Sequence, residues 1–289
     1  MCGYLFYKAI DKIIISEEQK IDKAEIIHKA RGPDNFKKLK IEKDNAIFYF
    51  RRLSIIGMDE KSNQPLEIEN FIIMFNGEIY NYESLKQKYL NDTKFYSKSD
   101  TEVILRLYIK YGFKIFSQLS GIYSILIYDR KNKKIITYRD PFGIKPLYYL
   151  FDKKKIIISS QARTISKIVN SDIDMSSKGI YDFLGNLISK DTIYKNIYSF
   201  EPGKINIINE SNNIKSETLE NIFDQNFFSK NTNINDVKES LYSSIRENLV
   251  SDVEVSLLFS SGFDSNIIAE NLPDNQYKLF TISTIMNSE

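Results

Sequence analysis

Apolar residues in the N-terminal part of this chain occur in short runs rich in β-branched and aromatic side chains, and polar turn residues separate the runs. Runs of this length and composition are typical of β-strands. Residues 130–133 and 152–154 each separate two neighbouring runs and predict hairpin turns. The predicted strands cover residues 3–7, 46–50, 71–75, 123–128, 134–139, 147–150 and 155–159.

One helix with defined ends is predicted over residues 100–111. Ser99 and Glu102 have the spacing of a capping box, apolar residues recur at helical spacing, and Gly112 follows the last turn. Helical patterns also cover residues 166–169 and 178–187. Many hairpins with few helices favour antiparallel sheets covered by helices over a βαβ array, so the predicted fold class is α+β.

A polar stretch rich in Asn and Ser over residues 209–235 predicts a linker between two domains, 1–208 and 236–289. After it, residues 237–249 predict a helix, 253–259 a strand, 260–265 a loop of small residues, 266–270 the start of a helix and 277–285 a second strand. This order is typical of the beginning of a parallel α/β domain. Two strands cannot complete such a domain, so we expect a truncated one.

Composition narrows the range of partners. The chain has 289 residues, enough for two domains, and a net charge of +2, which provides no strong field for nucleic acid or an anionic membrane. No charged-then-apolar leader opens the chain, and its apolar runs are far shorter than a membrane span. Cys2 is the only cysteine, which excludes an internal disulfide and favours a cytoplasmic location.

Cys2 is the first candidate for chemistry. If Met1 is removed, the thiol lies beside its own α-amine, so nucleophile and base belong to one residue. An amine with a pKa of about 8 accepts a proton from a thiol with a pKa of about 8.5 without a histidine. This suits a chain whose only histidine, His28, falls in a predicted helix and receives no catalytic role. The alternative is a small residue that happens to be cysteine.

Two arginine motifs allow both a structural and a functional interpretation. Arg31-Gly32-Pro33-Asp34 predicts a turn, with its arginine and aspartate bracing the loop. Arg52 follows the predicted strand 46–50, where a guanidinium can grip a carboxylate in bidentate fashion. The alternative for Arg52 is an ordinary surface charge.

Asn76 and Gly77 directly follow an apolar strand. Asn-Gly is a strong signal for a type I′ hairpin turn, which is the structural interpretation. In the functional interpretation, the Asn76 amide and the Gly77 N–H together stabilise the oxyanion of an acyl-transfer intermediate. Asp100 is either an acid favoured by the helix dipole or the anion that holds the ammonium group of a substrate.

The segment 260–265 lies between a predicted strand and a predicted helix and reads Ser-Ser-Gly-Phe-Asp-Ser. The N–H groups of a small-residue loop, together with the helix N-terminus behind them, form a phosphate cradle. A plain strand–helix turn is the alternative.

Taken together and in this order, the motifs resemble those of the glutamine-hydrolysing asparagine synthases. That family pairs an N-terminal class II glutamine amidotransferase domain, an Ntn-hydrolase fold with a four-layer antiparallel β sandwich flanked by helices, with a C-terminal ATP-pyrophosphatase domain. The resemblance is dense over residues 1–205. It rests on Met1-Cys2-Gly3, Arg31-Gly32-Pro33-Asp34, Arg52-Leu53-Ser54-Ile55, Gln64-Pro65-Leu66, Asn76-Gly77-Glu78-Ile79-Tyr80-Asn81, Ser99-Asp100-Thr101-Glu102, Arg139-Asp140-Pro141-Phe142-Gly143-Ile144-Lys145-Pro146-Leu147-Tyr148-Tyr149, Pro202-Gly203 and Ser251-Asp252-Val253 with the loop 260–265.

The resemblance implies a role for each candidate in the first domain. Cys2 attacks the side-chain amide of glutamine, with Asn76 and the Gly77 N–H as the oxyanion hole. Three further residues hold the glutamine: Arg52 its α-carboxylate, and Glu78 with Asp100 its α-ammonium.

In the second domain the resemblance implies ATP and Mg²⁺. Ammonia crosses a tunnel to this domain, where ATP activates a carboxylate, by family default that of aspartate. The implied ATP residues are Leu258 and Ile282 beside the adenine and Ser260, Gly262, Asp264 and Ser265 at the phosphates, with Asp264 also at the metal.

Four positions depart from the family pattern, namely Ala30, Lys98, Gln161 and Ser261. Ser261 replaces a glycine, and a positive φ there costs about 1 kcal/mol or more and crowds the phosphates. The first hypothesis is therefore a glutamine amidotransferase of asparagine-synthase type with a truncated synthetase domain, which by itself hydrolyses glutamine only. Two alternatives stay open: the chain is one subunit of a split amidotransferase, completed by a partner chain, or it is a non-catalytic relic or binding module. A homo-oligomer also stays open.

Overall fold

The computed structural model describes residues 1–174, 178–185, 190–210, 213–219, 233–260, 262–272 and 277–281. The chain divides into two compact units, Met1–Ile222 and Phe223–Glu289. Each unit is described by itself below.

The first unit contains two six-stranded antiparallel sheets. One sheet has the order β10 (Tyr198–Ser199), β8 (Tyr148–Phe151), β9 (Lys155–Ser159), β1 (Gly3–Ala9), β3 (Ala46–Arg52) and β2 (Asn35–Ile41). The other has the order β12 (Ile214–Thr218), β11 (Lys204–Ile208), β7 (Lys134–Arg139), β6 (Gly121–Asp129), β5 (Phe71–Ile79) and β4 (Leu66–Ile68).

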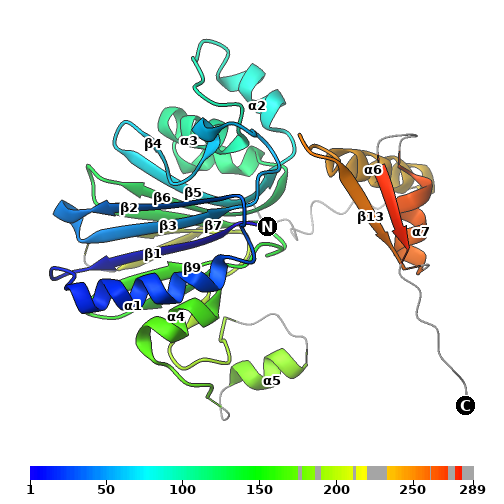
Figure 1. Cartoon of the computed structure of the whole chain (residues 1–289). Helices are drawn as coiled ribbons and strands as arrows, with labels where there is room; N and C mark the ends of the chain where they lie inside the picture. The colour runs from blue at the N-terminus through cyan, green and yellow to red at the C-terminus, as the bar shows by residue number, and fades with distance from the viewer. Residues whose placement is uncertain are drawn as a thin grey trace, which may run out of the picture. The chain divides into compact units, whose positions relative to one another are not determined.

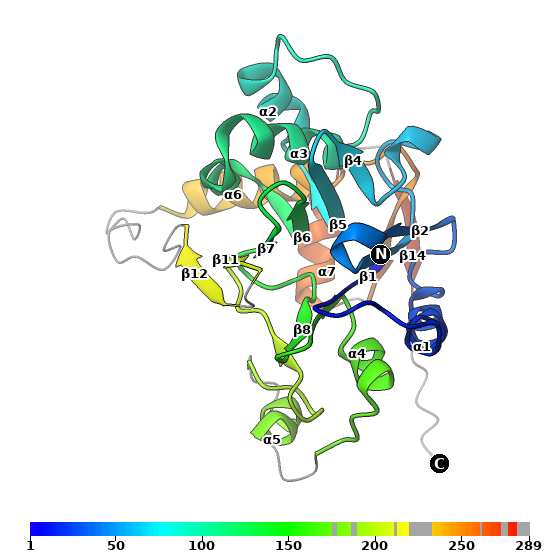
Figure 2. The same ribbon diagram turned by 90° about the vertical axis from the view of Figure 1, so that its left-hand side faces the viewer.

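Helices cover the outer face of each sheet, so the first unit has four layers (Figure 1). Helices α1 (Ile15–Glu25) and α4 (Ala162–Val169) pack on the first sheet, and α2 (Tyr82–Tyr89) and α3 (Asp100–Tyr111) pack on the second. Figure 2 shows α5 (Lys178–Leu184) near α4 at one end of this unit. Short 3₁₀ turns occupy Ile26–His28, Glu42–Asp44, Glu60–Ser62 and Phe113–Gln118.

The alternation of side chains along each strand explains the layers. In β1, Tyr4 and Phe6 point into the core between the two sheets, whereas Leu5 and Tyr7 point into the core beneath α1 and α4. In β5, Met74 joins the central core while its neighbours face α3. Strands buried on both faces therefore appear in the sequence as continuous apolar runs.

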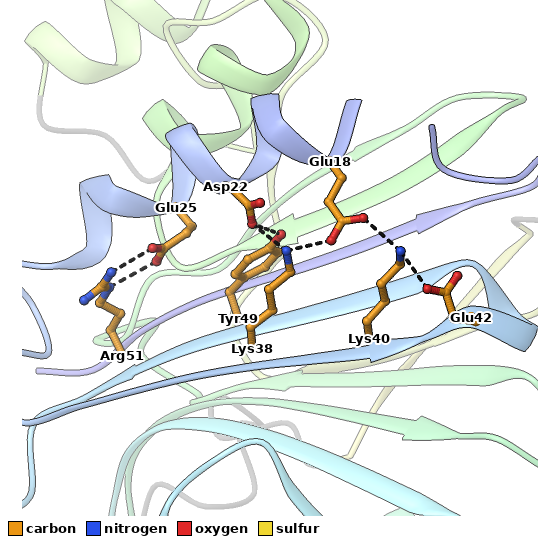
Figure 3. Close-up of polar contacts among 8 residues, drawn as sticks. All are labelled: Glu18, Asp22, Glu25, Lys38, Lys40, Glu42, Tyr49 and Arg51. Carbon is orange, nitrogen blue, oxygen red and sulfur yellow. Dashed lines mark hydrogen bonds and ion pairs between the residues drawn. The ribbon is translucent and has the colours of Figure 1, made fainter. Parts of the chain in front are cut away.

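Ion pairs join α1 to the strands β2 and β3 (Figure 3). The Lys38 ammonium lies 2.7 Å from carboxylate oxygens of both Glu18 and Asp22. Arg51 donates two hydrogen bonds to Glu25, at 3.1 and 2.7 Å. Lysines on the edge strand β2 thus fix the helix to the sheet and also discourage pairing with another chain. The remaining members of the network are Lys40, Glu42 and Tyr49.

The second unit contains α6 (Ile234–Glu247), β13 (Val255–Phe259), α7 (Phe263–Glu270) and β14 (Tyr277–Thr281). Strands β13 and β14 pair in parallel, as the sequence predicts for this segment. None of the described helices is both long and apolar enough to cross a membrane.

The structure confirms the seven predicted strands and the helix Asp100–Tyr111, where the Ser99 hydroxyl accepts the N–H of Glu102. The predicted linker 209–235 is wrong in part, because Ile214–Thr218 forms β12 and extends the sheet of the first unit beyond residue 208. The predicted C-terminal part of the strand 277–285 lies outside the described residues after Thr281.

Candidate active site

The first unit has a cavity of about 200 Å³ beside Cys2, at the ends of β1 and β3 and along the last part of β5. All six residues predicted for the glutamine site line it, although they come from distant parts of the sequence. The lining residues are Met1, Cys2, Arg52, Leu53, Ile55, Ile56, Gln64, Phe75, Asn76, Gly77, Glu78, Asp100, Thr101 and Lys145.

Cys2 directly precedes β1 and is held by the main chain of Leu53. Its sulfur lies 3.4 Å from the Leu53 nitrogen and 3.5 Å from the Leu53 carbonyl oxygen. Burial raises the pKa of the Cys2 thiol, and the hydrogen bond from Leu53 acts in the opposite direction. The main-chain nitrogen of Cys2 is bonded to Met1, so removal of Met1 would convert it into an amine at the cavity wall.

The Arg31–Asp34 turn fixes the chain around Cys2. Arg31 Nε donates to the Cys2 carbonyl oxygen at 3.0 Å, and Asp34 Oδ2 accepts the Ser54 N–H at 2.8 Å. A Cβ on Gly32 would lie 2.2 Å from the Arg51 carbonyl carbon, so this approach requires glycine. Arg31 and Asp34 thus brace this turn through bonds to two neighbouring segments.

Asn76 and Gly77 lie inside β5, so the hairpin-turn interpretation is wrong. They pair with Ser124 and Tyr123 of β6 in a regular antiparallel register. A Cβ on Gly77 would lie 2.1 Å from the Ile122 carbonyl oxygen. Glycine is therefore needed here for close strand packing.

The N–H of Gly77 lies on the edge of β5 that faces away from β6. Strand β4 pairs only with Phe71–Ile73, and further along this edge Gln64 bonds to both the N–H and the C=O of Phe75. The Ile79 N–H donates to Asp100 Oδ2 at 3.1 Å. Since alternate residues of a strand point their N–H groups to the same edge, the Gly77 N–H lies between these two at the cavity.

The Asn76 side chain is buried without a partner. The residue is 1% exposed, and neither Oδ1 nor Nδ2 makes a hydrogen bond within the described structure. Leaving a buried polar group unpaired costs about 1–3 kcal/mol. An amide held at that cost in the wall of a cavity with a thiol is a donor available to a ligand.

Arg52 is 4% exposed and its terminal nitrogens bond to the loop that follows β3. One donates to Asp59 O at 3.4 Å and to Asn63 Oδ1 at 3.0 Å. The other donates to Ile56 O at 3.0 Å and to Gly57 O. Arg52 thus organises this loop against the cavity, and its contact with a substrate carboxylate stays a prediction.

Asp100 and Glu78 contribute two carboxyl groups to the cavity. Asp100 begins α3 and is 4% exposed, and its other oxygen accepts the Thr101 N–H at 2.8 Å. Burial raises the pKa of Asp100 to about 7, against hydrogen bonds from Ile79 and Thr101, and Glu78 adds to the increase. Burial also raises the pKa of Glu78. Two partly desolvated carboxyl groups beside one cavity suit a cationic ligand.

Two cavity residues, Gln64 and Lys145, have no role predicted from the sequence, although both lie in motifs of the family pattern. Gln64 is 3% exposed and joins β5 to Thr101 of α3 through a bond of 3.2 Å. Lys145 follows β7 in a tight loop and brings an ammonium group to the cavity. His28 does not line the cavity; it is buried and bonds to Ser159 and Thr164.

The predicted ATP residues lie in the second unit. Gly262 is the N-cap of α7 and supplies no side-chain cap, and the Ser265 hydroxyl bonds to the Gly262 carbonyl. Ser260 lies 3.3 Å from Ser265, Asp264 is in the first turn, and Leu258 is 67% exposed. Ser261 and Ile282 lie outside the described residues. Within the described ranges no group of three His, Cys, Asp or Glu side chains that could hold a metal ion occurs.

Comparison with solved structures defines the class of fold. A structure described as the allosteric regulatory enzyme of purine biosynthesis matches with a TM-score of 0.55 over 97% of this chain and 64% of its own, at 17% identity. This likeness concerns the fold alone. The two antiparallel sheets with their covering helices agree with the predicted α+β fold class.

Comparison with known sequences defines the family. Residues 1–219 match the family described as "Glutamine amidotransferase domain", and the chain belongs to that family. Asparagine synthetase [glutamine-hydrolyzing] 1 of Bacillus subtilis is 31% identical over 98% of this chain and 45% of its own. A provisionally named asparagine synthetase [glutamine-hydrolyzing] 2 of Methanocaldococcus jannaschii is 32% identical over 93% of this chain and 56% of its own. The chain spans about half the length of these relatives.

Proposed function

We propose that the chain hydrolyses glutamine to glutamate and ammonia, with Cys2 as the nucleophile. One observation carries the proposal: the buried, unpartnered amide of Asn76 lies in the same cavity wall as the only thiol of the chain. An unpaired donor next to a nucleophile suits an intermediate whose negative charge exists only during the reaction. Membership in the glutamine amidotransferase family supports the choice of substrate.

The reaction begins when Met1 has been removed. The Cys2 α-amine accepts the thiol proton, and the sulfur adds to the carboxamide carbon of glutamine. The oxyanion accepts hydrogen bonds from Asn76 Nδ2 and the Gly77 N–H. The amine returns its proton to the leaving nitrogen, and ammonia departs. Water then adds to the thioester and releases glutamate and the thiol.

The two ends of the glutamine backbone are held by opposite charges. Asp100 and Glu78 bind the α-ammonium, and its positive charge favours the ionised form of both carboxyl groups. Arg52 binds the α-carboxylate. Because its terminal nitrogens hold the loop after β3, we infer that substrate binding exchanges part of these contacts for the carboxylate.

We further propose that the second unit begins an ATP-dependent synthetase of asparagine-synthase type, in which the ammonia amidates a carboxylate. The names of the relatives suggest aspartate as the acceptor. The uncapped N-terminus of α7 and the hydroxyls of Ser260 and Ser265 fit a phosphate group. Mg²⁺ would then be held by Asp264 and by phosphate oxygens. ATP supplies the activation of the carboxylate.

The proposed synthetase requires further polypeptide to cover the sheet of the second unit. Parallel sheets are stable when both faces are covered, and β13 and β14 form a two-stranded sheet within the described part of this unit. A cavity of about 370 Å³ lined mostly by apolar side chains lies between α6, β13 and α7. A longer polypeptide, a separate subunit or a second copy each fits this role. The single, unpaired Cys2 supports a cytoplasmic location.

The test is release of glutamate from glutamine by the purified protein. Cys2→Ala should abolish release, and Cys2→Ser should lower it by several orders of magnitude, because a serine hydroxyl is a poorer nucleophile at neutral pH. Tyr96→Phe, which changes an exposed tyrosine that does not line the cavity, is the control and should be fully active. Activity that survives in Cys2→Ala would refute the proposed nucleophile, and an inactive wild type would favour the non-catalytic relic.

A further inference from the structure

The buried side chain of Lys145 lies in the wall of the cavity beside Cys2. The residue is 5% exposed and lines the same cavity as Cys2 and Glu78. Its ammonium forms no hydrogen bond or ion pair with the residues that the structure describes. Burying an ammonium group is costly unless nearby negative charge compensates it. The burial of the Lys145 ammonium therefore depends on the charges that surround the cavity.

The loop 140–145 fixes the backbone of Lys145 on both sides. The buried Asp140 carboxylate accepts the N–H groups of Ile144 at 2.8 Å and Lys145 at 2.9 Å. Arg139 Nε donates to the Lys145 carbonyl oxygen at 2.8 Å. These bonds fix the point at which the side chain leaves the loop, and the buried side chain lines the cavity.

The charges around Lys145 come from several elements. Burial lowers the pKa of Lys145, whereas Glu78 of β5, the Cys2 sulfur and Asp140 act in the opposite direction, and Arg31 adds to the decrease. Burial lowers the pKa of the Met1 α-amine, and Lys145 and Arg31 add to this decrease, so positive charge surrounds the position next to Cys2. The other charged groups facing the thiol are Arg52 and Asp100.

We propose that Lys145 is a positioning residue of the reaction centre, whose ammonium faces Cys2 across the cavity and stabilises its thiolate. The same charge disfavours protonation of the neighbouring α-amine, so the amine remains available as a base. The role of Lys145 in catalysis rests on the proposed glutamine hydrolysis, whereas its effect on the Cys2 thiol is independent of that function.

Alkylation of the thiol tests this proposal without any substrate. Because Cys2 is the only cysteine, the rate of its reaction with iodoacetamide as a function of pH gives its pKa. In Lys145→Met the pKa of Cys2 should rise by about half a unit to one unit, and alkylation at pH 7 should slow by about three- to tenfold. Lys145→Arg keeps the charge and should restore the wild-type pKa.

Two further variants make the result specific. Lys8→Met removes another buried lysine, 8% exposed, that does not line this cavity, and should leave the thiol unchanged. Lys145→Gln replaces Lys145→Met if the latter does not fold. Equal thiol pKa values in the wild type and the uncharged variants would overturn the proposal, as would an equal rise in Lys8→Met.

The same experiment separates this inference from the proposed function. A raised thiol pKa in Lys145→Met, in a protein that does not hydrolyse glutamine, would support the role of Lys145 and refute the proposed function. An unchanged thiol pKa in an enzyme that hydrolyses glutamine would refute the role of Lys145 alone.

Discussion

Single side chains in the cavity are kept in states that cost stability. Asn76 has an unpaired buried amide, and Asp100 is a carboxyl group whose pKa is raised to about 7 by burial. Neither state improves folding, because an apolar or a solvated side chain would avoid the cost. Both become favourable when a ligand supplies the missing partner. Variants at these positions should therefore separate activity from stability.

Asn76→Ala should reduce kcat for glutamine hydrolysis by roughly 100- to 1000-fold, because it removes one donor to the oxyanion. KM should change little, since the donor acts on charge that develops in the transition state. The melting temperature should stay the same or rise, because no hydrogen bond within the protein is lost. Steady-state kinetics and calorimetry check these results. A loss of stability with unchanged kcat would contradict the assignment of Asn76.

Asp100→Asn should change the pH dependence of stability. Between pH values of about 4 and 7, folded Asp100 holds a proton that an unfolded aspartate has released, so the wild-type free energy of unfolding falls as pH rises. Asparagine does not titrate. Relative to the variant, the wild type should lose up to about 4 kcal/mol over this range, measured by urea unfolding. A difference that does not depend on pH would show that Asp100 has an ordinary pKa.

Strand β5 is the element on which the site depends. Its paired edge joins β6, and its opposite edge presents Phe75, Gly77 and Ile79 in turn to Gln64, the cavity and Asp100. One strand thus places the Gly77 N–H, proposed to bind the oxyanion, next to the Ile79 N–H, which holds the Asp100 carboxyl group proposed to bind the ammonium. This geometry requires that residue 77 has no side chain.

Gly77→Ala should lower the free energy of unfolding by at least about 2 kcal/mol, because its Cβ would meet the Ile122 carbonyl at 2.1 Å. Gly112→Ala is the matched control. Gly112 also has a positive φ, 71°, but nothing lies within 4 Å of its Cβ position, so only about 1 kcal/mol should be lost. Denaturant unfolding checks both. Equal losses would show that strand packing places no demand on residue 77.

The central strands were predictable because both of their faces are buried, as in the run 71–75. Strands β2 and β12 were not predicted, because they lie at sheet edges and lysine or glutamate interrupts any apolar run in them. Motif spacing identified the candidates from Cys2 to Asp100. It could not show that Asn76 lacks a partner or that Lys145 reaches the cavity, since both depend on contacts between distant segments.

At the scale of the whole molecule, the described cores belong to the first unit. All three hydrophobic clusters lie between Tyr4 and Ile208, whereas Ile245 is the one buried apolar residue described after Ile222. The residues of the candidate active site also lie in the first unit. The proposed glutamine hydrolysis should therefore need only this unit.

A fragment of residues 1–222 should fold and should hydrolyse glutamine at a rate within about threefold of the full chain, because it keeps the three hydrophobic clusters and every residue that lines the cavity beside Cys2. Its melting temperature should stay within a few degrees of the main transition of the full chain. Calorimetry and the glutamate assay check this. An unfolded fragment would mean that the first unit depends on residues 223–289.

The most direct test of the account is mass spectrometry of the protein after reaction with a diazo-ketone analogue of glutamine. We predict that Met1 is absent, that one adduct forms at the N-terminal sulfur of Cys2, and that glutamine slows this labelling. Retention of Met1, or labelling of Cys2 that is no faster than that of a free thiol and is unaffected by glutamine, would contradict the account.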